Sequence, residues 1–278
     1  MLAFRPAALS VSVLALIGLG GCDAPPPGVK PAPQGSEDCV VLAEGLYEFQ
    51  DGQFLAVSAA SLQVTSGTGA EREIAHGFAG SGFPWMGLKL RGQVATLTGM
   101  APSADAKAAA FSAGAAAIAA HPQGGPGVLV VDGISVEGGE RGVGEALVQL
   151  SDSGARLDTC QRAFTDTMAG RNIQFESGNA RISPVSARLL DAVTGVAKLC
   201  SGFVIEIGGH TDSRGADDFN LRLSQERADA VRDYLVGKGV PEESLLSVGY
   251  GETRPLDPAL TAEAYEKNRR TEFKVIQR

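Results

Sequence analysis

The residues best suited to chemistry lie in one stretch, 208–231, with the sequence GGHTDSRGADDFNLRLSQERADAV. It follows the apolar run FVIEI, which predicts a buried strand, so the polar residues occupy the loop after its carboxyl end, a usual place for ligand-binding residues. In the helix predicted next, Asn220, Ser224 and Arg227 lie at i, i+4 and i+7 and share one face. From that face Arg227 can point back toward Asp212, or toward a ligand that both contact. One carboxylate and one guanidinium suit a zwitterion, because aspartate binds an ammonium group and arginine binds a carboxylate.

Other interpretations of these residues stay open. Asp212 and Arg227 could form only an internal salt bridge. His210 and Asp212 supply two metal ligands without a second histidine or a suitably placed cysteine, so we predict no metal site. Catalysis needs a nucleophile with an oriented base, or a metal-bound water, yet His76, His121 and His210 are scattered and no HExxH or serine-elbow motif occurs. We therefore predict a binding protein without a cofactor, not an enzyme.

The composition limits the possible partners. The 278 residues are 44% hydrophobic and 20% charged, which is typical of a folded chain of one or two domains. The formal net charge of −8 argues against nucleic-acid binding, which needs a basic surface. A polyanionic ligand must therefore be held in a specific pocket.

The N-terminus indicates export. Residues 1–21 contain one early arginine, an apolar run too short to span a bilayer comfortably, and then small residues, as in a signal peptide. The segment LGGC resembles the lipobox of bacterial lipoproteins, which implies cleavage before Cys22 and a lipid on its sulfur. A plain signal peptide followed by a chance cysteine is the alternative. Residues 22–38 are rich in proline and predict an extended linker that lifts the folded part off the membrane.

Three cysteines remain in what would be an oxidising compartment. Cys160 and Cys200 flank one structural unit and are the best candidates for a disulfide. Cys39 is then left over, either as a buried thiol or paired elsewhere.

The folded part predicts an α+β protein made of two small α/β sandwich domains, 39–140 and 157–278, joined by a hinge at 141–156. In the first domain we expect a helix near 69–78, two strands around Gly92, a helix capped by Ser103 and a strand at 127–136. The segments GQVATLTGMAPSADAKAAA and GVLVVDGISV resemble a BON domain. That resemblance implies association with phospholipid or an envelope protein.

The second domain predicts alternating strands and helices: strands at 172–175, 203–209, 245–251 and 270–276, with helices at 183–200 and 219–239. The residues TDSRGADDFNLRLSQERADAVRDYL, followed by VGYGETRP and NRRTEF, resemble the OmpA C-terminal, peptidoglycan-binding domain of the OmpA, Pal and MotB type. The resemblance implies that Asp212 and Arg227 bind the meso-diaminopimelate of peptidoglycan stem peptides. Asn220 and Arg269 are lesser candidates in the same pocket.

Together these features predict a lipid-anchored protein at the periplasmic face of the outer membrane, tethering that membrane to the cell wall. The alternative is an envelope stress or assembly factor whose BON-like domain binds lipid or a protein partner, with wall binding only localising it. A metal-dependent wall hydrolase is a third hypothesis.

Overall fold

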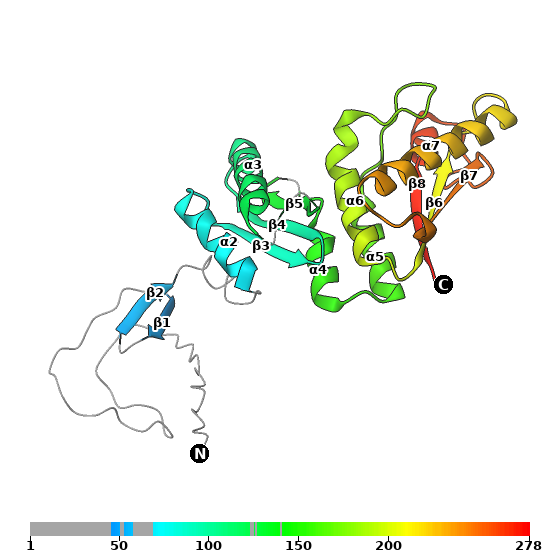
Figure 1. Ribbon diagram of the computed structural model, residues 1–278. Coiled ribbons are helices and arrows are strands. Elements are labelled where there is room, and N and C mark those ends of the chain that lie inside the picture. Colours follow the sequence, from blue (N-terminus) through cyan, green and yellow to red (C-terminus); the bar gives the residue numbers. More distant parts are fainter. Residues whose placement is uncertain (1–45, 51–52, 58–68, 123–124, 126, 140) are drawn as a thin grey trace, which may run out of the picture. The chain divides into compact units, whose positions relative to one another are not determined.

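The computed structural model describes residues 46–50, 53–57, 69–122, 125, 127–139 and 141–278 (Figure 1). The chain divides into two compact units, 1–66 and 67–278. In the first unit, strands β1 (Leu46–Gln50) and β2 (Gln53–Val57) pair antiparallel. The expected signal peptide, Cys22, the 22–38 linker and Cys39 lie outside the described residues. Across the described segments, every helix is too short or too polar to cross a bilayer.

The second unit begins with helices and strands in the order expected from the sequence: α2 (Gly69–Gly80), β3 (Met86–Arg91), β4 (Val94–Ala101), α3 (Ala104–Ala120) and β5 (Leu129–Val136). The sheet order is β3-β4-β5, with β3 antiparallel and β5 parallel to β4. Gly92, at φ 53°, makes the tight turn between β3 and β4. Ser103 caps α3 by accepting a hydrogen bond from the backbone N–H of Ala106 at 3.1 Å. The sequence therefore predicted this part correctly, while its resemblance to a BON domain stays a prediction.

Two helices occupy the region expected to contain the hinge and the start of the second domain. They are α4 (Glu145–Ser153) and α5 (Leu157–Met168), joined by Gly154 at φ 76°. Leu147 and Leu150 lie one turn apart on α4 and are buried. A helix with a buried apolar stripe packs as part of the fold, so residues 145–153 are not an extended connection.

The C-terminal part forms a second three-stranded sheet of order β7-β6-β8. Its elements are α6 (Ala187–Leu199), β6 (Val204–His210), α7 (Asp217–Gly237), β7 (Leu245–Gly251), α8 (Ala262–Asn268) and β8 (Thr271–Ile276). Short 3-10 turns at Pro184–Ser186 and Glu242–Ser244 precede α6 and β7. The central strand β6 is parallel to β7 and antiparallel to β8. Helix α7 packs on β6 and β7, and α5 packs on β8 (Figure 1).

The strand predicted at 172–175 is wrong. Only Phe175 pairs, in an isolated antiparallel bridge with Ile182. The backbone of Gln174 forms no strand pairing among the described residues. Its N–H donates a hydrogen bond to Ser186 Oγ at 2.8 Å, and its carbonyl accepts one from the Ser183 N–H at 2.8 Å. Residues 172–175 are therefore a fixed loop.

Residues from both expected domains share one hydrophobic core. Val94 and Val131 of the β3-β4-β5 sheet lie in the same buried cluster as Leu147 of α4 and Ile205 of β6. Helix α6 approaches so closely at Gly195 that a Cβ there would lie 3.0 Å from Leu147 and 3.3 Å from Val131. The described parts of 67–278 thus pack as one body.

The predicted disulfide between Cys160 and Cys200 is present, with 2.02 Å between the sulfur atoms. Both residues are buried in the shared core. The bond joins α5 to the end of α6. The disulfide therefore crosslinks two helices of the layer beside the β7-β6-β8 sheet.

Candidate ligand-binding site

The site is built where β6 ends and the chain turns into α7. At Gly209 a Cβ would clash with the carbonyl oxygen of Ser224, so only glycine lets α7 lie this close to the strand. Ser224 fixes the same junction, because its Oγ accepts a hydrogen bond from the Gly251 N–H at 2.8 Å. The Thr211 N–H donates to the Gly251 carbonyl at 3.0 Å. These contacts hold the loop 211–216 against the end of the sheet.

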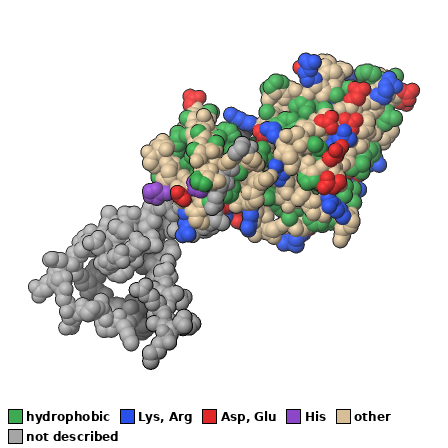
Figure 2. All heavy atoms as spheres, in the orientation of Figure 1, with side chains coloured by type: hydrophobic (Ala, Val, Ile, Leu, Met, Phe, Trp, Pro, Cys, Tyr) green, Lys and Arg blue, Asp and Glu red, His purple; other side chains and the backbone are tan. Residues whose placement is uncertain are grey.

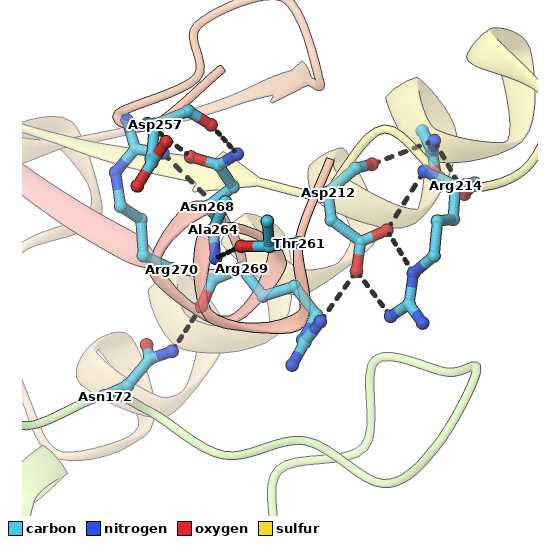
Figure 3. A network of polar contacts seen from close by, with 10 residues as sticks. Asn172, Asp212, Arg214, Asp257, Thr261, Ala264, Asn268, Arg269 and Arg270 are labelled. Atoms are coloured by element: carbon cyan, nitrogen blue, oxygen red, sulfur yellow. Dashed lines mark hydrogen bonds and ion pairs between the residues drawn. The ribbon is translucent and has the colours of Figure 1, made fainter. Parts of the chain in front are cut away.

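Asp212 lies at the centre of a set of charge-assisted hydrogen bonds (Figure 3). Its Oδ1 accepts from the backbone N–H of Arg214 at 3.1 Å and from Arg214 Nε at 3.2 Å. Its Oδ2 accepts from Arg214 Nη2 and from Arg269 Nη1, both at 2.7 Å. Burial alone would raise the pKa of Asp212, but the hydrogen bonds from Arg214 and Arg269 outweigh it and lower the pKa to about 2. The carboxylate is therefore ionised throughout the physiological range.

Arg227 does not pair with Asp212. Within the described residues its Nε donates to the carbonyl of Asn179 at 3.1 Å, and its guanidinium carbon lies 5.0 Å from the centre of the Phe175 ring. Burial, and after it the positive charge of Arg269, lower the pKa of Arg227, while Asp212 acts in the opposite direction. The internal salt bridge between Asp212 and Arg227, one of the interpretations left open by the sequence, is therefore not formed among the described residues. Arg227 instead contributes a partly buried positive charge to the site.

A pocket of about 420 Å³ lies beside these residues. It is lined by residues 172–175, Gly209, His210, Arg227, Glu266 and 269–271. Arg227 from α7 and Arg269 from the end of α8 thus meet in one cavity although 42 positions separate them in sequence (269 − 227). Asp212 is not among the lining residues, but its carboxylate is hydrogen-bonded to Arg269, which is. Together the two guanidinium groups and this neighbouring carboxylate can bind a carboxylate and an ammonium group.

Asn220 supports the loop and does not line this pocket. Its buried amide donates to the carbonyls of Asp212 and Arg214, both at 3.2 Å, and to Glu252 Oε2 at 2.6 Å. All of these contacts are within the protein. In this geometry Asn220 positions Asp212 through the loop backbone.

His210 lies at the pocket wall with 3% of its surface exposed. Its ring stacks on Tyr250 with 5.1 Å between centroids, and neither ring nitrogen has a hydrogen-bond partner among the described residues. His210 is therefore a structural residue that packs as an aromatic ring. Burial, and then the positive charge of Arg270, lower the pKa of His210 to about 4.

Two residues of the site, Arg214 and Phe175, were not expected from the sequence. Arg214 lies two residues after Asp212, and an aspartate whose side chain accepts from the N–H two residues on is a recognised turn signal. Phe175 comes from a segment assigned to a strand, and nothing in its local sequence indicates the stacking on Arg227. Asn172, from the same segment, donates to the backbone carbonyl of Arg269 and so links the loop to α8 (Figure 3).

Residues 174–269 match the model of the OmpA family. This part of the chain is an OmpA-like domain. The match includes the β6–loop–α7 junction with Asp212, Asn220 and Arg227, and it ends at Arg269. Most of the pocket lining therefore lies within the region that carries the similarity, while residues 172–173 and 270–271 lie just outside it.

Two curated relatives extend the comparison. The chain is 32% identical to the peptidoglycan-binding protein ArfA of Mycobacterium bovis over 192 residues, covering 69% of this chain and 54% of ArfA. It is 37% identical to the probable lipoprotein YiaD of Escherichia coli over 102 residues, covering 37% of this chain and 47% of YiaD. The chain thus spans about half the length of these relatives. A solved structure, the peptidoglycan-associated lipoprotein of Burkholderia pseudomallei, is 29% identical with a TM-score of 0.34, covering 37% of this chain and 86% of that one.

The similarity to ArfA reaches beyond the OmpA-like domain. Residues 174–278 number 105 (278 − 173), so an alignment of 192 residues of this chain includes at least 87 that precede residue 174 (192 − 105). Those residues extend into the described α+β part that shares its core with the OmpA-like domain.

Proposed function

We propose that this protein binds peptidoglycan non-covalently through the pocket of its OmpA-like domain, and that the group it grips is the free zwitterionic end of meso-diaminopimelate. The observation that carries the proposal is the convergence of Arg227 and Arg269 on one pocket, with the ionised Asp212 bonded to Arg269. The family match supports it. The similarity to the peptidoglycan-associated lipoprotein of Buchnera aphidicola, 36% identical over 102 residues, supports the proposal as well.

The chemistry assigns a role to each charged group. Arg227, whose Nη atoms have no hydrogen bond within the described residues, donates to the ligand carboxylate as a planar fork. Arg269 supplies a second guanidinium to the same carboxylate or to a neighbouring one. Asp212 receives the ammonium group. Asn220 keeps Asp212 in place through the loop backbone.

The wall contact fits a tethering role. Lipid on Cys22 would hold the chain at the periplasmic face of the outer membrane, and the 22–38 linker would span the distance to the wall. Surface charge alone does not attract the chain to an anionic polymer, because the net charge is −8 and acidic and basic side chains intermix on the C-terminal part of the face in view (Figure 2). The pocket must therefore supply the affinity.

Co-sedimentation with purified peptidoglycan tests this proposal. The full chain in mild detergent should pellet with the wall, and Arg227→Met should stay in solution because the ligand carboxylate loses its main partner. Arg222→Met is the matched control, since Arg222 is an exposed arginine on the same helix. Equal pelleting of Arg227→Met and the wild type would refute the proposal.

A further inference from the structure

The carboxylate that would bind the ligand ammonium is already occupied by the protein. Arg214 forms a two-point contact with Asp212, Nε to Oδ1 at 3.2 Å and Nη2 to Oδ2 at 2.7 Å, in the geometry that an external cation would also seek (Figure 3). Arg269 takes a second position on Oδ2. A ligand ammonium can therefore reach Asp212 only if one of these guanidinium groups moves.

Arg214 is the one placed to move. Its side chain is 62% exposed, against 41% for Arg269, while the Asp212 side chain that both contact is only 8% exposed. Backbone hydrogen bonds hold the end of α8 that carries Arg269. The Arg269 N–H donates to the Tyr265 carbonyl, and the Arg269 carbonyl accepts from the side chain of Asn172. The Arg214 side chain has Asp212 as its polar partner among the described residues.

The Arg214 side chain also contacts the ring of Tyr265. The guanidinium carbon lies 4.8 Å from the ring centroid, within the range of a cation–π contact. Releasing Asp212 therefore leaves the arginine with a favourable neighbour on α8 and with water. This lowers the cost of displacement.

From this geometry, and resting on the proposed function, we infer that Arg214 is an affinity-determining residue: an internal cation that occupies the face of Asp212 which the ligand ammonium must take. A ligand with an ammonium group replaces one charge-assisted contact by another. A ligand with only carboxylates needs only the guanidinium groups of Arg227 and Arg269, so it has no reason to displace Arg214. Arg214 thus lowers affinity for the zwitterion moderately and does not weaken binding of simple dicarboxylates.

The effect of removing the competitor should be modest. A largely exposed ion pair is weakened by solvent, so we expect Arg214→Met to bind the ligand about three- to tenfold more tightly. Arg214→Lys keeps the charge but loses the two-point fork, and it should fall between Met and the wild type. The loop should survive both changes, because the backbone N–H of residue 214 still donates to Asp212 Oδ1.

The test is calorimetric titration of the full chain in detergent with a soluble disaccharide tripeptide that ends in meso-diaminopimelate, and separately with pimelate, which lacks the amino groups. We expect Arg214→Met to tighten binding of the muropeptide, while Arg222→Met leaves it unchanged. Pimelate should bind Arg214→Met no more tightly than it binds the wild type, because the uncovered Asp212 carboxylate repels an anion. Equal or weaker binding of the muropeptide by Arg214→Met, with the wild type binding normally, would overturn the inference and leave the proposed function standing. Absence of binding by both proteins would refute the proposed function, and the inference with it.

Discussion

We predict that His210 makes the stability of the OmpA-like domain depend on pH. His210 is the last residue of β6, and its buried ring stacks on Tyr250, with Nε2 3.4 Å from the position that a Cβ on Gly208 would take. Burial and the positive charge of Arg270 lower its pKa to about 4, with Arg254 acting the same way. Glu272, whose carboxylate lies 3.6 Å from Nε2, opposes them without reversing the shift, as does Glu206 to a smaller extent.

The sign and size of the effect follow from proton linkage. The unfolded chain protonates a histidine near its ordinary pKa of 6.5, whereas the folded protein protonates His210 only near a pKa of about 4. Between these values the unfolded state binds the extra proton, so stability falls as the pH is lowered from 7 to 4. The difference between the two pKa values corresponds to a loss of about 3 kcal/mol in the free energy of unfolding.

Urea denaturation of the full chain, followed by circular dichroism at several pH values, measures this loss. His210→Gln removes the titrating group and should reduce the pH dependence by about 3 kcal/mol relative to the wild type. His76→Gln is the matched control at an exposed histidine and should behave as the wild type does. Identical pH dependence of His210→Gln and the wild type, or a His210 ring that titrates near pH 6.5 by NMR, would contradict the reasoning.

Three further perturbations test the packing around the site. Replacing Cys160 and Cys200 together by alanine should cost about 4 kcal/mol, since the bond closes a loop of 40 residues; an unchanged urea midpoint would argue against this. Gly209→Ala should cost about 3 kcal/mol or prevent folding, because its Cβ would enter the backbone of α7, whereas Gly202→Ala, with no neighbour within 4 Å, should change the melting temperature little. Asn220→Ala should cost about 2 kcal/mol in thermal unfolding because it leaves buried carbonyls without donors, and wild-type stability would show that the loop does not depend on this amide.

The parts of the site that the sequence predicted are those determined locally. The strand β6, the loop after it and the helix α7 follow from an apolar run, a glycine-rich polar loop and an amphipathic stretch in direct succession. The helical spacing puts Arg227 on the face of α7 that points toward the loop end of the sheet, and there it lines the pocket.

The partner of Asp212 could not be predicted in the same way. Arg269 reaches Asp212 across 57 residues, and its position depends on how the short helix α8 ends before β8. The Asp–x–Arg spacing places Arg214 close to Asp212 along the chain. It does not show whether the arginine side chain points away from Asp212 or folds back to bind it.

The packed helix α4, within the range predicted as a hinge, was not expected from the sequence for a related reason. The apolar stripe of α4 is short, and the glycines before it indicate a helix-breaking segment. Its burial arises from contact with α6, a tertiary interaction that involves Gly195 and Leu147. Composition alone therefore favours two independent domains, although the described parts share a core.

The most direct test of the central claim is whether the pocket distinguishes meso-diaminopimelate from lysine. Calorimetric titration of the full chain should compare two soluble muropeptides that differ only in carrying meso-diaminopimelate or L-lysine, which lacks the second carboxylate. We predict saturable binding of the first and binding at least about tenfold weaker of the second, because Arg227 would be left without its anion. Arg227→Met should reduce binding of the first to the level of the second. Equal affinity of the wild type for both muropeptides would contradict the account.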